Sequence, residues 1–170
     1  MESIVRYRLG ALIIALLFVL PGLALAKPAV PSWRDNHPWS TEIATVHVGG
    51  VELHPEIADT PQLQQRGLGY RDGLSPDGAM IFVFNDASVQ TFWMKGMRFC
   101  LDIIWIEGGQ VVGAAERVCP MPTVDSAELP RYSSEVPVRY VLEVEAGWMD
   151  LNGVNAGTSV EIILPDSQPD

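Results

Sequence analysis

Apolar and polar residues alternate with a period of two over most of the chain after residue 42, which is the spacing of β-strands. Strands are expected at residues 43–48, 51–57, 79–84, 89–94, 99–106, 110–116, 138–145 and 159–164. Gly49-Gly50 and Gly108-Gly109 each separate two such runs and therefore predict hairpins. Because no strand–helix–strand spacing occurs, the pattern favours a mainly β fold, a single compact domain resembling a β-sandwich or barrel.

Two short segments depart from this alternation and are expected to be helical. Thr60 followed by Pro61 has the form of an N-cap with proline at the first helical position, and Gly67 marks the end of that segment. Residues 147–152 predict a second helical turn. A polar, proline-containing loop is expected over residues 120–137. One or two short helices thus accompany the predicted strands.

The first 26 residues have the organisation of a secretion signal. Two arginines precede an apolar run at residues 9–20, Pro21-Gly22 interrupts it, and Ala24-Leu25-Ala26 is a small-x-small cleavage site. We therefore expect residues 1–26 to be a signal peptide and the mature protein to be periplasmic or secreted. An uncleaved membrane anchor is the alternative, although the apolar run is short for a membrane span. Only in that case would a membrane be a partner.

The rest of the chain divides into three parts. Residues 27–42 are rich in proline and predict a flexible lead-in, residues 43–165 predict one β-rich domain, and residues 166–170 form a tail. Cleavage after residue 26 leaves nine basic and twenty acidic residues, a net charge of −11. This acidity argues against nucleic acid as a partner, because no basic patch exists to neutralise phosphates. The oligomeric state stays open.

Cys100 and Cys119 are the only cysteines, and they flank the second predicted hairpin. A strict two-residue turn places Cys100 opposite Arg117, so the two sulfur atoms would be diagonal neighbours and not direct partners. A bulge near Val118 would bring them together. Two interpretations therefore remain open: a disulfide, which would stabilise the folded protein by about 3 kcal/mol, and a pair of buried thiols.

The candidate chemistry centres on Lys95, one of only two lysines in the sequence. Strand alternation places Trp93 and Lys95 on one face, so an indole lies beside an ammonium group. Asp102 stands at the start of the apolar run 103–106, and a carboxylate there needs a partner, for which Lys95 or Arg98 is the obvious choice. These groups predict either a binding site for a sugar, a carboxylate or a peptide end, or a structural ion pair.

Two weaker patterns involve other polar residues. His47, Glu52 and His54 share one face of the first hairpin, but their spacing matches no metal motif, so no metal or other cofactor is expected. Glu143 and Glu145 alternate with Val144, and together with Asp102 they could supply a pair of carboxylates for glycoside hydrolysis if the fold brought them together. Exposed glutamates on a strand are common, so this second pattern is a weak one.

Several motifs, taken in order, resemble the family called domain of unknown function 192. They are Arg66-Gly67-Leu68, Met80-Ile81-Phe82-Val83-Phe84, Phe92-Trp93-Met94-Lys95, Leu101-Asp102-Ile103 and Leu142-Glu143-Val144 with Ala146-Gly147. The resemblance covers about residues 43–164 and implies a single, mostly β, extracytoplasmic domain with no assigned activity. It points to five recurrent polar or aromatic positions as candidate binding residues: Arg66, Trp93, Lys95, Asp102 and Glu143.

The chain departs from the family pattern beside this lysine. Gly96-Met97 stand where an Asn-Thr pair is usual, and Gly69 replaces a common methionine. The loss of an amide and a hydroxyl removes hydrogen-bonding groups next to Lys95. A ligand that uses those groups in other members would be bound differently here.

We expect a non-enzymatic binding or accessory domain of the cell envelope, with Trp93, Lys95 and Asp102 at a site for a small polar ligand or an envelope glycan. One alternative is a structural or protein-interaction module whose polar motif holds the fold together. The other is a hydrolase or lyase that uses Lys95 or a carboxylate pair as acid and base. The sequence has no phosphate-binding loop, nucleophile elbow or zinc-protease motif, which counts against an enzyme without excluding one.

Overall fold

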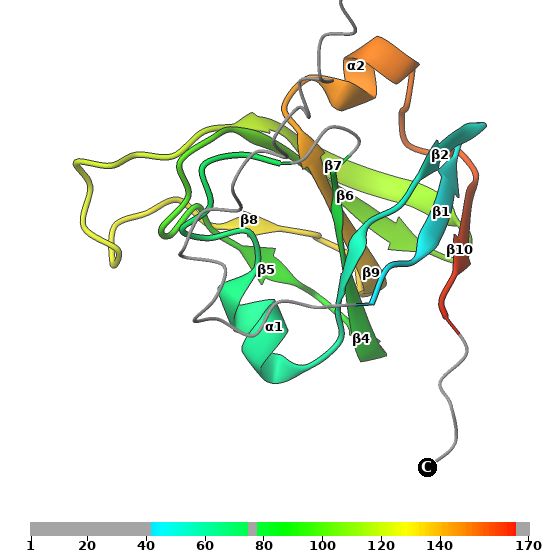
Figure 1. Ribbon diagram of the computed structural model, residues 1–170, viewed down its shortest axis with the longest axis horizontal. Coiled ribbons are helices and arrows are strands. Elements are labelled where there is room, and N and C mark those ends of the chain that lie inside the picture. Colours follow the sequence, from blue (N-terminus) through cyan, green and yellow to red (C-terminus); the bar gives the residue numbers. More distant parts are fainter. Residues whose placement is uncertain (1–41, 75–77, 166–170) are drawn as a thin grey trace, which may run out of the picture. The chain divides into compact units, whose positions relative to one another are not determined.

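The computed structural model describes residues 42–74 and 78–165, all within one unit of the chain (Figure 1). The elements of this unit, in chain order, are β1 Thr45–Val48, β2 Val51–Leu53, β3 Glu56–Ala58, α1 Pro61–Arg66, β4 Met80–Ser88, β5 Thr91–Phe92, β6 Leu101–Glu107, β7 Gln110–Val118, β8 Tyr132–Ser133, β9 Val138–Glu145, α2 Trp148–Asn152 and β10 Val160–Ile163. Neither of its helices is long and apolar enough to cross a bilayer. The expected signal peptide, nearly all of the lead-in and the tail lie outside the described residues.

The strands of the described unit form three sheets, none of which closes into a barrel. Five strands make the central sheet in the order β3-β4-β9-β6-β7, while β10-β1-β2 and β5-β8 make two smaller sheets (Figure 1). Every strand pair is antiparallel except β3 with β4, which are parallel and are connected through α1. The expected mainly β fold with two short helices is confirmed.

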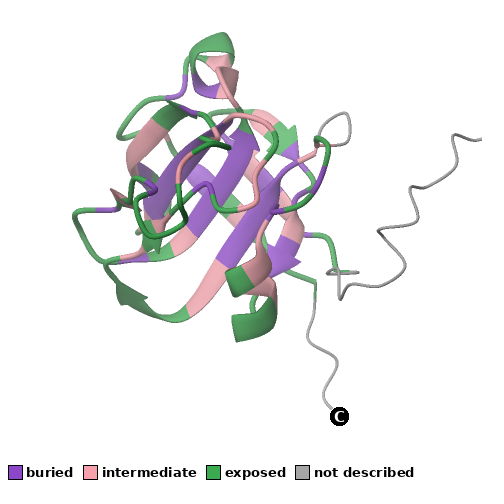
Figure 2. Ribbon diagram, turned by 90° about the vertical axis from the view of Figure 1, so that its left-hand side faces the viewer, coloured by how far each residue is buried: buried purple, intermediate pink, exposed green. Residues whose placement is uncertain are grey.

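Side-chain alternation divides the core between the two faces of the central sheet. One face packs Ile104 and Leu142 against the sheet β10-β1-β2. The opposite face packs Phe82 and Ile103 against residues of α1, β5 and β8. Because both faces are covered, the first six residues of β6 are all buried, and the purple strands of Figure 2 mark this core. A strand buried on both sides shows no polar alternation.

The local turn and cap signals are confirmed. Gly49-Gly50 and Gly108-Gly109 all have positive φ, between 57° and 95°, as a two-residue hairpin turn requires. The hydroxyl oxygen of Thr60 accepts a hydrogen bond from the backbone N–H of Leu63 at 3.3 Å, and Gly67 is the C-cap residue that follows α1. These signals depend on a few adjacent residues, so the sequence alone suffices to find them.

Two strand predictions need correction. Residues 51–57 are predicted as one strand, but the structure has β2 and then β3, which pairs with the central sheet instead. Pro55 lies between them, and its missing N–H cannot continue a ladder. Residues 89–94 are predicted as a strand, yet only the two residues of β5 pair, with β8. β8 itself lies within the expected loop 120–137.

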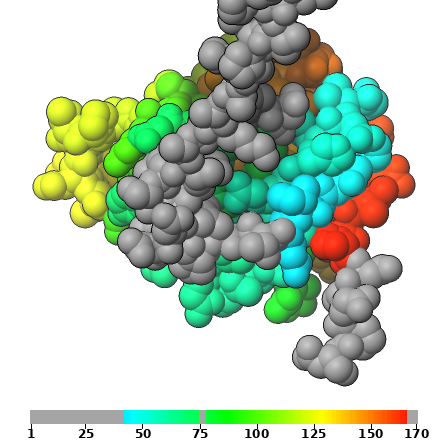
Figure 3. All heavy atoms as spheres, viewed as in Figure 1, coloured from blue at the N-terminus to red at the C-terminus, as the bar shows by residue number. Residues whose placement is uncertain are grey.

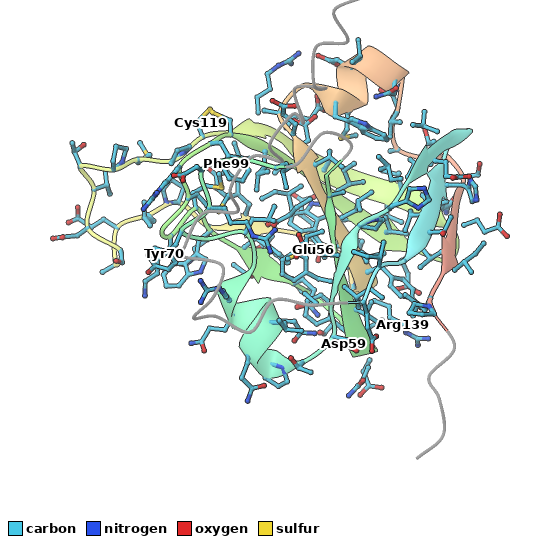
Figure 4. All side chains as sticks on the ribbon, in the orientation of Figure 1. Glu56, Asp59, Tyr70, Phe99, Cys119 and Arg139 are labelled. Carbon is cyan, nitrogen blue, oxygen red and sulfur yellow. A yellow bond between two sulfur atoms is a disulfide. The ribbon has the colours of Figure 1, made fainter. Side chains whose placement is uncertain are left out.

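Cys100 and Cys119 form a disulfide, with 4.1 Å between their Cα atoms (Cys119 is labelled in Figure 4). Strand β7 contains two register shifts relative to β6, one near the hairpin turn and one opposite Asp102. Each shift adds one residue to β7, so Leu101 pairs with Val118 and the two cysteines follow as the next pair. The expected bulge near Val118 is present, but a second bulge is needed as well.

Replacing both cysteines with serine is expected to lower the free energy of unfolding by about 3 kcal/mol. The disulfide joins residues 19 positions apart and therefore restricts the unfolded chain. Urea titration followed by tryptophan fluorescence measures the change, and wild-type protein in reducing agent is the matched control. A loss of less than about 1 kcal/mol in both samples contradicts the expectation.

Candidate functional site

A cavity of about 390 Å³ lies on the face of the central sheet that carries Phe82. Helix α1 and the turn that follows it line one side, while β5 and the turn after it contribute Trp93 and Lys95. Strand β9 contributes one residue, Glu143. Four of the five candidate binding residues thus line one cavity: Arg66, Trp93, Lys95 and Glu143. Asp102 is not among the lining residues.

The indole of Trp93 and the amine of Lys95 lie close together. The Lys95 Nζ atom is 5.0 Å from the centre of the Trp93 ring, within the range of a cation–π contact. Strand-like alternation continues through this segment, because Phe92 and Met94 point toward the core while Trp93 and Lys95 are exposed. The shared face expected from the sequence is therefore present, even though only the first part of the segment is a paired strand.

A second cation contacts the same indole. The guanidinium carbon of Arg131 lies 3.9 Å from the Trp93 ring centre. Arg131 belongs to the segment after the disulfide, which projects at one side of the described unit (yellow, Figure 3). Sequence reasoning missed this residue, because nothing in a polar loop shows which distant side chain it will contact.

Glu143 is the most unusual group of the cavity. It lies in β9, the middle strand of the central sheet, with Met80 of β4 and Ile103 of β6 as its cross-strand neighbours. Only 6% of its surface is exposed, and this burial raises the pKa of its carboxyl group to about 8, against the opposing effect of the positive charge of Arg71. Its Oε2 atom has no hydrogen-bond partner among the described residues. At neutral pH this carboxyl group is therefore mostly protonated.

Arg71 is a buried charge that the sequence does not reveal. Its guanidinium donates two hydrogen bonds to the carboxylate of Glu56, at 2.5 and 2.8 Å. Strand register places Glu56, Met80 and Glu143 in one row across β3, β4 and β9, so Glu56 and Glu143 share a face of the sheet (Glu56 is labelled in Figure 4). An arginine in a predicted turn is usually solvated, which is why no sequence pattern marks this one.

Arg66 ends α1 and supplies the second cationic group of the lining. Partial burial lowers the pKa of its guanidinium, and the nearby positive charge of Arg71 lowers it further. The guanidinium remains charged at neutral pH. Arg66 and Lys95 thus bring two positive charges to a cavity that also contains a neutral carboxyl group.

Two glycines explain how the turns that carry these cations approach each other. A Cβ atom on Gly69 would lie 3.1 Å from the carbonyl oxygen of Arg66 and 3.3 Å from that of Lys95. A Cβ atom on Gly96 would lie 2.8 Å from the ring of Tyr70, whose N–H donates to the Gly96 carbonyl at 2.8 Å. Both departures from the family pattern therefore fall where this close packing leaves no room for a side chain. The Tyr70 ring occupies that space and lines the cavity.

Asp102 lies on the other face of the central sheet. Its cross-strand neighbour is Val144, which belongs to the opposite core cluster, whereas Ile103 is the neighbour of Glu143. The carboxylate accepts three backbone hydrogen bonds, from the N–H groups of Arg117 at 2.7 Å and of Gly147 and Met149 at 3.0 Å each. It joins β6 to the bulge of β7 and to the start of α2.

Two expectations about Asp102 are therefore wrong. Its partners are backbone N–H groups and not Lys95 or Arg98, the latter being paired with Asp72. Nor do Asp102 and Glu143 form a carboxylate pair for glycoside hydrolysis, because adjacent positions on neighbouring strands place them on opposite faces. Among the described residues that line the cavity, Glu143 is the acid that accompanies Trp93 and Lys95.

The first hairpin shows the expected shared face of polar residues. His54 lies 3.2 Å and His47 3.9 Å from the carboxylate of Glu52, and all three side chains are at least one-third exposed. Within residues 42–74 and 78–165, no group of three or more histidine, cysteine or acidic side chains is arranged to hold a metal ion.

The geometry defines a small β domain with a ligand-sized cavity on its central sheet. The chain belongs to the family domain of unknown function 192 (DUF192), described as "Uncharacterized ACR", which matches residues 44–162. A provisionally named transcription regulator from Sinorhizobium meliloti 1021 is similar in structure, with a TM-score of 0.63 and 28% identity over 74% of this chain and 95% of its own. A protein of unknown function from Novosphingobium aromaticivorans DSM 12444 has a TM-score of 0.61 and 29% identity over 70% and 83%. No functionally curated protein matches the chain.

Proposed function

We propose that this domain is a non-enzymatic binding module of the extracytoplasmic space that holds a small anionic ligand in the cavity between α1 and Trp93. The observation that carries this proposal is the position of Glu143, which lines a ligand-sized cavity and whose buried Oε2 atom lacks a hydrogen-bond partner among the described residues. A buried polar group without a partner costs free energy, and a bound ligand would remove that cost.

The charges around the cavity support an anion as the ligand. Arg66 and Lys95 line it, and Arg131 contacts its tryptophan. These are three of the seven lysines and arginines in the described residues, although the whole chain has a net charge of −10. A local concentration of positive charge in an acidic protein attracts anions to that place.

The extracytoplasmic location is part of the proposal and depends on the signal-like pattern of residues 1–26. The disulfide between Cys100 and Cys119 supports it, because such bonds persist in oxidising compartments. Fractionation of the native host, with blotting of periplasmic and cytosolic extracts, tests this point. Protein of full length in the cytosol would contradict it.

Replacing Lys95 with methionine is expected to weaken anion binding about tenfold to a hundredfold, since a hydrogen bond to a charged group is lost. The affinity is measured by calorimetry or by Trp93 fluorescence against a panel of carboxylates and phosphates. The free energy of unfolding should change by less than about 0.5 kcal/mol, because Lys95 is exposed.

Arg139→Met is the matched control, because it also removes one exposed positive charge and lies far from Tyr70 in Figure 4. It should leave the affinity unchanged. Equal affinities for wild type and Lys95→Met would contradict the assignment of the site. A stability change above about 1 kcal/mol in Lys95→Met would instead support a structural role for the Trp93–Lys95 motif.

One observation favours an enzyme as the second candidate. A carboxyl group with a pKa of about 8 has the form of a general acid, and it lines the same cavity as the amine of Lys95. The reaction would be a hydrolysis or an elimination with Glu143 as the proton donor. Turnover of a bound ligand that is abolished in Glu143→Gln would establish it, whereas recovery of the ligand unchanged after prolonged incubation supports binding alone.

A further inference from the structure

We propose that the ligand is an acidic sugar, a hydroxylated ring that carries one carboxylate. This inference rests on the proposed function, because it names the class of anion that the same cavity would hold. The argument uses three kinds of groups in the lining: aromatic rings, polar groups that need hydrogen bonds, and cations. A ligand that satisfies all three kinds must combine a ring, hydroxyl groups and a negative charge.

Four aromatic rings line the cavity. Phe82 and Phe92 meet edge to face with 4.8 Å between their ring centres, and both line the cavity together with Tyr70 and Trp93. The negative faces of such rings attract the weakly positive C–H groups on the faces of a sugar ring. A bare inorganic anion such as phosphate would leave this wall without a partner.

The polar groups of the lining call for hydroxyls. A protonated Glu143 offers one O–H donor and one acceptor oxygen, which matches a sugar hydroxyl that accepts and donates at once. Gln62 and Gln65, both exposed on α1, add amide groups that also donate and accept. An apolar carboxylic acid of the same size would bury the Glu143 carboxyl group without a partner, which costs about tenfold to a hundredfold in affinity.

The cations of the lining favour a ligand that carries a negative charge. Arg66 and Lys95 both line the cavity, and a carboxylate bound there is attracted by both positive charges, whereas a neutral ring is not. The cavity of about 390 Å³ is at the small end of the range for ligand sites, so it suits one ring and not a stretch of polymer. Free sugar acids and the terminal residue of an acidic glycan share this chemistry.

Calorimetry on the mature protein at pH 6.5 tests the proposal with four probes: glucuronate, glucose, cyclohexanecarboxylate and inorganic phosphate. Glucuronate should bind at least tenfold more tightly than each of the other three. Lys95→Met should reduce the preference for glucuronate over glucose, while Glu143→Leu should reduce the preference for glucuronate over cyclohexanecarboxylate. The control Arg139→Met should retain both preferences.

Binding of methyl glucuronide as tight as that of glucuronate would support a terminal glycan residue, and weaker binding would support the free acid.

The outcomes separate this inference from the proposal on which it rests. If cyclohexanecarboxylate or phosphate binds most tightly and Lys95→Met weakens it, the domain binds anions but the acidic sugar is wrong. If glucose binds as tightly as glucuronate, the role of the two cations is wrong and the inference fails. If a wider panel of carboxylates and phosphates also gives no heat and no fluorescence change, both proposals fail together.

Discussion

Asp102→Ala is expected to lower the free energy of unfolding by about 3–5 kcal/mol. The carboxylate is fully buried and accepts hydrogen bonds from three backbone N–H groups, those of Arg117, Gly147 and Met149. Alanine would leave all three donors without their partner, and a buried donor that loses its partner costs about 1–3 kcal/mol. Urea titration at neutral pH measures the change.

Asp150→Asn is the control for that experiment. Asp150 is exposed and pairs with the side chain of Arg117, so this variant changes the same region without removing a buried acceptor. Its stability should differ from wild type by less than about 1 kcal/mol. A loss of similar size in both variants would show that the stability lost in Asp102→Ala comes from the surface ion pair and not from the three buried hydrogen bonds.

Asp102→Asn, if folded, should bind ligand as wild type does, because Asp102 faces away from the cavity.

The misplacement of Asp102 shows where the sequence stops being informative. Alternation correctly places Trp93 and Lys95 together, since residues two apart share one face of an extended segment whatever the polarity of their neighbours. Strand β6 is buried on both faces, so its run of apolar residues does not reveal which face Asp102 shares with any other residue. That face depends on the register between β6 and β9, which pairs residues about forty positions apart. No local signal fixes such a register.

The missed residues have a related cause. Arg71 acquires its role only when β3 pairs with β4 in parallel and brings Glu56 into the row of Glu143. The sequence does contain one sign of this arrangement, because Pro55 interrupts the predicted strand 51–57 at the point where the chain changes sheets. Turns, caps and hairpins can be predicted from the sequence because each depends on neighbouring residues. The cavity cannot be predicted in this way, since its lining combines α1, two turns and the middle strand of the sheet.

The folded protein is expected to lose stability as the pH rises from about 4.5 to 8 because of Glu143. The pKa of this carboxyl group is about 8 in the folded protein, compared with an ordinary value of 4.5, and burial is the main cause. Between these two values the folded protein binds one proton more than the unfolded chain. Stability then falls with rising pH, by at most about 1.4 kcal/mol per pH unit from this group. The contribution is complete below pH 4.5 and is lost as the pH passes 8.

Glu143→Gln removes this dependence, because the amide has nearly the same shape and cannot ionise. Relative to wild type, the variant should gain about 3.5 kcal/mol in unfolding free energy between pH 5 and pH 8, as measured by urea titration at several pH values. Glu145→Gln, two residues along the same strand and exposed, should leave the pH slope of wild type unchanged. Parallel pH profiles for wild type and Glu143→Gln would mean that the carboxylate is charged in the folded protein at neutral pH.

An ionised Glu143 would repel an anion from the cavity, so affinity for an anionic ligand should also fall as the pH rises above 8 in wild type but not in Glu143→Gln. Agreement between the two pH profiles, one of stability and one of binding, would tie the cavity's function to the protonation of this single buried group.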